Sequence, residues 1–154
     1  MNLVVHGIPT TDVAALRDGG PDANGQPALV RIAQGLANPC RHCLQLIPEG
    51  EEKLVFSYRP FPSIQPYAET GPIFLHKRPC NRYEGKTLPS WFAFLQPAII
   101  RGYDASDWSR YDTGDVVDGK DLAETCRRIL SMEGIAFVHI RSKWNCFQCQ
   151  VDRA

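Results

Sequence analysis

The chain has 154 residues, of which 44% are hydrophobic and 22% charged, and its 17 basic side chains balance its 17 acidic ones. This length suits one domain, and the average globular composition excludes a disordered chain, a coiled coil and a fibrous repeat. Because the net charge is zero, no overall field attracts nucleic acid or an anionic membrane, and neither is an expected partner. We therefore expect a single domain over residues 1–154.

The amino-terminal segment predicts no export. Met1–His6 has no basic region, and its apolar run is too short for a signal peptide or a membrane span. We therefore expect a cytoplasmic protein. In a reducing compartment, cysteines are more often metal ligands, buried thiols or catalytic groups than permanent disulfides, and this prior applies to all six.

Apolar runs bounded by proline and glycine predict the elements of the first half. Leu3–Ile8 is rich in β-branched residues and stops at Pro9, which indicates a strand. A short helix should follow, with Thr10 or Thr11 as its N-cap, and end at Gly19–Gly20. Turn-rich segments separate three further expected strands, at 28–33, 54–58 and 72–76.

The second half predicts one longer helix among strands. Ala98–Tyr103 indicates a strand, and Asp118 is a suitable N-cap for a helix over Gly119–Met132, where apolar residues recur at helical spacing. Ile135–Arg141 is apolar on both faces, as in the interior of a sheet, and should form a hairpin with Cys146–Asp152. The predicted class is α+β: a mainly antiparallel sheet of about six or seven strands, one longer C-terminal helix and one short N-terminal helix.

Four stretches carry a resemblance that runs over nearly the whole chain: Asn38–Leu44 (NPCRHCL), Glu69–His76 (ETGPIFLH), Arg101–Ala105 (RGYDA) and Asn145–Arg153 (NCFQCQVDR). With these stretches in this order, the chain resembles the bacterial domain-of-unknown-function family 1203. The resemblance implies a small stand-alone bacterial protein. It implies no activity and carries over no catalytic residue.

Two Cys-x-x-Cys pairs, Cys40 with Cys43 and Cys146 with Cys149, have the ligand count of a structural zinc site. The pairs are far apart in sequence, so the fold must bring them together. If Cys146–Asp152 is a strand, its alternation places the two sulfurs of the second pair on opposite faces, which opposes a shared site. The alternative is buried or loosely paired thiols, with Cys126 and Cys149 in the core. Zinc is the one cofactor that the sequence suggests.

A cysteine-dependent enzyme is a further hypothesis. The thiolate of Cys40 or Cys43 would be activated by a nearby base such as His42 or His76. The alternative is that Arg41 and His42 are exposed turn residues. A redox Cys-x-x-Cys normally opens a helix, which the turn-forming residues after this pair do not favour.

Polar residues gather at two predicted strand ends. His76 ends one strand and precedes a basic segment that contains Arg82, while Arg101 and Tyr103 end another. If these ends are neighbours, the four residues converge with Glu69 on one pocket for a phosphate or carboxylate. The alternative is a solvated loop. The leading hypothesis is therefore a domain that binds a small molecule or a protein partner, with no assignable chemistry, ahead of a zinc-stabilised domain and a cysteine-dependent enzyme.

Overall fold

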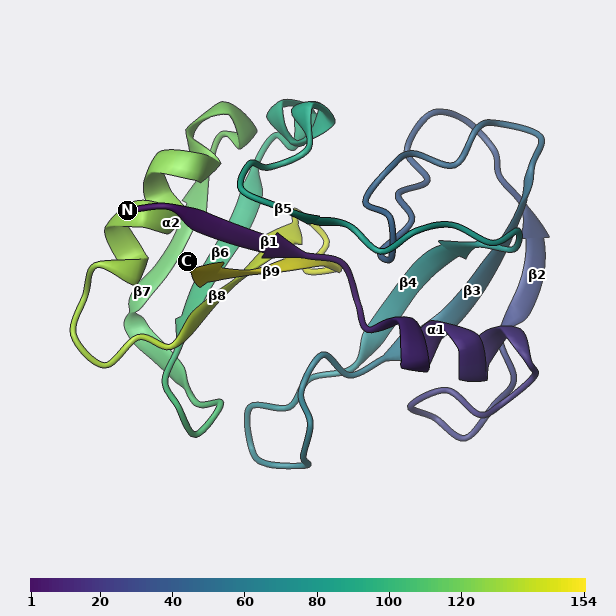
Figure 1. Cartoon of the computed structure of the whole chain (residues 1–154), viewed down its shortest axis with the longest axis horizontal. Coiled ribbons are helices and arrows are strands. Elements are labelled where there is room, and N and C mark those ends of the chain that lie inside the picture. Colours follow the sequence, from purple (N-terminus) through teal and green to yellow (C-terminus); the bar gives the residue numbers. More distant parts are fainter.

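The computed structural model describes residues 1–154 as an α+β fold with two antiparallel sheets (Figure 1). The larger sheet has six strands in the order β5-β1-β9-β8-β6-β7, and the smaller has three in the order β2-β3-β4. The strands are β1 (Leu3–His6), β2 (Leu29–Ile32), β3 (Glu52–Tyr58), β4 (Gly71–His76), β5 (Glu84–Gly85), β6 (Ala98–Tyr103), β7 (Ser109–Val117), β8 (Phe137–Ser142) and β9 (Phe147–Arg153). The α+β class and the antiparallel pairing are confirmed, but the strands divide between two sheets where one was expected.

Two α-helices flank the sheets, α1 (Thr10–Arg17) and α2 (Leu122–Leu130), and two 3₁₀ turns accompany them, η1 (Ser90–Phe94) and η2 (Gly119–Asp121). The Asp118 side chain caps η2 by accepting from the backbone N–H of Lys120, and η2 leads directly into α2. The predicted threonine N-cap of α1 is wrong, because Pro9 holds that position without a side-chain cap. Neither helix has the length and apolarity needed to cross a bilayer.

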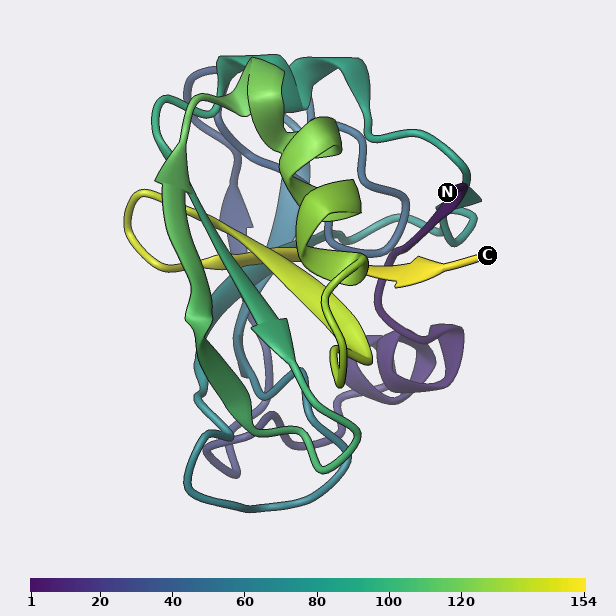
Figure 2. The ribbon, with the colours of Figure 1, turned by 90° about the vertical axis from the view of Figure 1, so that its left-hand side faces the viewer.

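The hydrophobic core has two parts, one for each sheet. Helix α2 covers one face of the six-stranded sheet (Figure 2), and its Leu122, Ile129 and Leu130 are fully buried there. Helix α1 packs Val13 and Leu16 into a second cluster with residues of β3 and β4. The apolar stripe that predicted the longer helix is thus the surface that α2 buries.

Strands β8 and β9 form the hairpin expected from the sequence, and β8 lies inside the sheet between β9 and β6. The register shifts along this pair, because Ile140 is opposite Cys149 while the next residue, Arg141, is opposite Phe147. A bulge of this kind redirects side chains. Phe147 consequently packs in the core of the smaller sheet, whereas Cys149 packs in the core under α2.

Candidate metal centre

Three cysteines and one histidine meet beside the smaller sheet. The ligand atoms of Cys40, Cys43, His76 and Cys80 all lie within 4.8 Å of one another. The Sγ atoms of Cys40 and Cys80 are 3.9 Å apart, and the Sγ of Cys43 is 3.4 Å from Nδ1 of His76. A tetrahedral site with Zn–S bonds of about 2.3 Å places its sulfurs about 3.8 Å apart. The four donor atoms therefore already have the spacing of a tetrahedral metal site.

The first two cysteines are held by a tight turn. The backbone N–H of Leu44 donates to the carbonyl of Cys40 at 2.9 Å, and the N–H of Cys40 donates to the carbonyl of Gln45 at 2.9 Å. Leu44 adopts φ = 57°, a conformation that favours glycine. Its side chain is 1% exposed in the core under α2, and burial of a leucine offsets this backbone strain.

The other two residues come from the smaller sheet and the segment after it. His76 is the last residue of β4, and Cys80 follows in the connection to β5. A parallel bridge between Cys40 and Phe74 places the cysteine turn beside β4. Three segments, at 40–43, 76 and 80, thus contribute to the centre.

Polar groups around the centre direct N–H donors at its sulfurs. The backbone N–H of His76 donates to Sγ of Cys40 at 3.4 Å, and the Arg17 guanidinium donates to Sγ of Cys80 at 3.4 Å. Nδ1 of His42 is 3.1 Å from the same Cys80 sulfur, while its Nε2 is 2.9 Å from Oγ1 of Thr10. An Nδ1–H donor on His42 would therefore orient Cys80, with the threonine hydroxyl fixing the ring.

The expectation that Arg41 and His42 are exposed turn residues is wrong, because they are 4% and 2% exposed. Arg41 donates from Nε to the carbonyl of Phe147 at 2.7 Å and from Nη1 to that of Pro39 at 2.8 Å. Burial lowers the pKa of Arg41 to about 10, although neighbouring thiols act in the opposite direction. Arg41 therefore joins the cysteine turn to β9 through buried hydrogen bonds.

Hydrogen bonding within the sulfur cluster shifts the pKa values of its thiols in opposite directions. Hydrogen bonding with Cys43, and to a smaller extent with Cys80, lowers the pKa of Cys40. The same hydrogen bond raises the pKa of Cys43, because its proton is held between the two sulfurs. A metal ion that binds these cysteines displaces the protons of their thiols.

The profile of the family described as "Protein of unknown function (DUF1203)" matches residues 37–153. The chain belongs to this family. The matched range contains all four residues of the candidate centre, while β1, α1 and β2 precede it. No curated protein and no solved structure matches the chain.

In this DUF1203 chain, the second cysteine pair does not join the centre. Cys149 is fully buried in the core under α2, where burial raises the pKa of its thiol well above the usual value. Cys146 lies just before β9, and its backbone N–H donates to Oγ of Ser142. The predicted four-cysteine set is therefore corrected: Cys40 and Cys43 keep their place, and the structure groups them with His76 and Cys80.

The five residues of the predicted pocket do not all lie together. Glu69 and Arg101 do meet, at 2.8 Å, and Asn145 also donates to Glu69. Tyr103 is buried and stacks on Phe137 at 5.1 Å. His76 lies in the metal centre and Arg82 lies beside β1, where it donates to the carbonyl of Gly7. Glu69, Arg101 and Tyr103 are thus neighbours, whereas His76 at the end of β4 and Arg82 beside β1 lie apart from them.

Two of the four residues of the candidate centre were not predicted as metal ligands from the sequence. His76 and Cys80 have a His-x-x-x-Cys spacing, which is within the range that structural zinc sites use for their second pair. Following Cys40-x-x-Cys43, this spacing was the available signal. The second Cys-x-x-Cys pair is a more familiar metal-binding pattern than the His76–Cys80 spacing, and it was therefore chosen instead.

Proposed function

We propose that the protein binds one Zn²⁺ through Cys40, Cys43, His76 and Cys80, and that the ion stabilises the smaller sheet and the turns around it. The observation that supports this is the mutual distance of the four donor atoms, all within 4.8 Å. Sulfur and imidazole ligands in a compact group of four are typical of structural zinc.

The donor set favours zinc and a structural role. Thiolates are soft ligands that select zinc over magnesium or calcium, and a Cys₃His set is one of the known structural combinations. Catalytic zinc keeps an open position for water, whereas four protein ligands complete the tetrahedron. Cys40 is fully buried, which further restricts access to the ion.

The charges near the centre are consistent with the proposal. Zn²⁺ with three thiolates carries one negative charge, and the Arg17 guanidinium beside Cys80 supplies one positive charge. Arg17 also donates to the carbonyls of His76 at 2.9 Å and Arg78 at 2.8 Å. One side chain from the last turn of α1 thus neutralises the centre and positions two of its segments.

Metal analysis of the protein purified without added zinc tests the proposal. We expect about one zinc per chain in the wild type and a loss of most of it in Cys43→Ser and Cys80→Ser. Cys146→Ser is the matched control and keeps its zinc, since Cys146 lies outside the group. Zinc-free wild-type protein would overturn the proposal, as would loss of zinc in the Cys146→Ser variant with retention in Cys80→Ser.

A further inference from the structure

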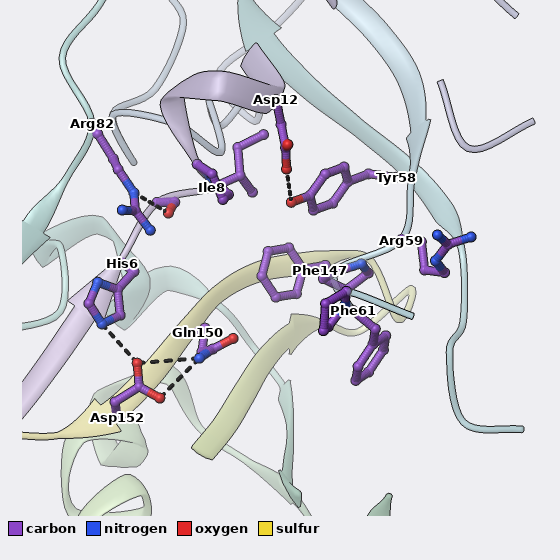
Figure 3. A pocket seen from close by; sticks show the side chains of 14 residues that line it. His6, Ile8, Asp12, Tyr58, Arg59, Phe61, Arg82, Phe147, Gln150 and Asp152 are labelled. Atoms are coloured by element: carbon purple, nitrogen blue, oxygen red, sulfur yellow. Dashed lines mark hydrogen bonds and ion pairs between the residues drawn. The ribbon is translucent and has the colours of Figure 1, made fainter. Parts of the chain in front are cut away.

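A second site lies beside β1, separate from the metal centre. A pocket of about 500 Å³ is formed where β1, the start of α1, the segment after β3 and strand β9 meet (Figure 3). None of the four centre residues lines it. Its volume lies within the range of roughly 300–1,000 Å³ that is usual for small-molecule sites.

One wall of this pocket is aromatic. Tyr58, Phe61 and Phe147 lie on the same side in Figure 3. The rings of Tyr58 and Phe147 are 6.2 Å apart, and Phe147 also packs edge-on against His139 at 4.9 Å. The Tyr58 hydroxyl donates to Asp12 at 3.1 Å, which fixes its ring. Burial raises the pKa of Tyr58, so this wall stays uncharged at neutral pH.

The opposite wall is polar and already satisfies its acidic group. Oδ2 of Asp152 lies 2.8 Å from Nε2 of His6, and its Oδ1 accepts from the Gln150 amide at 3.0 Å. Figure 3 shows the amide oxygen of Gln150 directed away from Asp152. The Asp152 carboxylate is thus hydrogen-bonded within the protein on both of its oxygens.

The arginines of the pocket are less fully engaged. Arg82 donates from Nε to the carbonyl of Gly7 at 2.9 Å and from Nη1 to Glu84 at 2.9 Å, and these two bonds leave Nη2 without a protein partner. Arg59 forms no ion pair, and its Nε is buried without a hydrogen-bond partner. Nη2 of Arg82 is therefore a charged donor of the pocket that remains for an anionic group, although Arg82 is also ion-paired with Glu84.

We infer that this pocket binds a small aromatic carboxylate, with the ring against Tyr58 and Phe147 and the carboxylate on Nη2 of Arg82. The aromatic wall supplies the apolar and edge-to-face contacts for a ring. The guanidinium supplies the charge-assisted hydrogen bond that distinguishes an acid from its neutral amide. The inference depends only on the pocket and does not require the zinc site.

Titration of the protein, with its metal retained, against phenylacetate tests the inference by calorimetry or by NMR chemical shifts. Phenylacetamide lacks the charge, and acetate lacks the ring. Loss of one charge-assisted hydrogen bond costs roughly 1.5–3 kcal/mol, so phenylacetamide should bind about tenfold to hundredfold more weakly than phenylacetate. Acetate should bind more weakly still, because it forms no contact with the aromatic wall. Equal binding of acid and amide, or no binding of phenylacetate at millimolar concentration, would overturn the inference.

Two variants locate the binding site. Arg82→Gln should weaken phenylacetate about tenfold or more, while Arg31→Gln on the exposed strand β2 is the matched control and should not change it. Because Arg82 also holds the Gly7 carbonyl, Gln150→Glu provides a second test that leaves that contact intact. The added carboxylate should repel phenylacetate and leave phenylacetamide unaffected. Equal loss in Arg82→Gln and Arg31→Gln would contradict the site.

Discussion

We expect Val138→Ala to lower the free energy of unfolding by more than the loss of two methyl groups alone would predict. Val138 is fully buried on β8, opposite Gly102 of β6 and Val151 of β9, and it packs in the core under α2. Truncation removes two methyl groups, worth about 1.6 kcal/mol at about 0.8 kcal/mol each. A residual cavity of about 50 Å³ adds about 1.2 kcal/mol. We therefore expect the free energy of unfolding to fall by about 2–3 kcal/mol.

Trp144→Ala is the informative comparison, because it removes a larger side chain from the β8–β9 turn. Trp144 is 74% exposed, and its ring contacts the ammonium group of Lys143 at 4.5 Å. Its loss should change the free energy of unfolding by no more than about 0.5 kcal/mol. Urea unfolding of both variants, followed by circular dichroism, measures the two effects. A neutral Val138→Ala, or a more damaging Trp144→Ala, would refute the assignment of both the strand and its turn.

Two further predictions concern buried residues, one at His139 and one at Gly7. Burial lowers the pKa of His139 well below its usual value, so below about pH 6.5 the unfolded chain gains a proton that the native state excludes. The free energy of unfolding should therefore fall by up to about 1.4 kcal/mol per pH unit on acidification, and His139→Phe should reduce that slope in urea titrations at several pH values. An unchanged slope would contradict a neutral, buried His139. A Cβ at Gly7 would overlap the carbonyl oxygen of His42, so Gly7→Ala should disturb the cysteine turn and lower zinc content, whereas Gly71→Ala meets open space and should retain it. Equal zinc content in the two glycine variants would argue against this contact.

Local patterns predicted the elements whose buried face repeats along the chain. The strand at Ala98–Tyr103 has the predicted bounds, and the apolar stripe of α2 identified the longer helix. Strand β7 was not predicted, because most residues of Ser109–Val117 are polar or exposed. This strand is defined by its pairing with β6 and not by an apolar face. Strand β2 was found, yet all four of its residues are exposed at the edge of the smaller sheet. Apolar sequence therefore identified this strand without revealing its burial.

The candidate metal centre depends on long-range contacts that no local pattern contains. Cys40 reaches His76 because the cysteine turn bridges to Phe74 on β4. Cys146 and Cys149 stay outside the group although Arg41 of the cysteine turn donates to the carbonyl of Phe147 on β9, and no local pattern gave a reason for this. The prediction that Cys149 is a core residue is confirmed, since it is fully buried in the core under α2. The sequence indicated which kinds of side chain could bind a metal, whereas the arrangement of the strands was needed to show which of them lie together.

X-ray absorption at the zinc edge of the protein as purified tests the central proposal most directly, because it reports the atoms bound to the ion. The account predicts a first shell of three sulfurs at about 2.3 Å and one nitrogen at about 2.0–2.1 Å, as for Cys40, Cys43, Cys80 and His76. A shell of four sulfurs would contradict the assignment of His76. A shell of oxygen and nitrogen alone would contradict the cysteine centre itself.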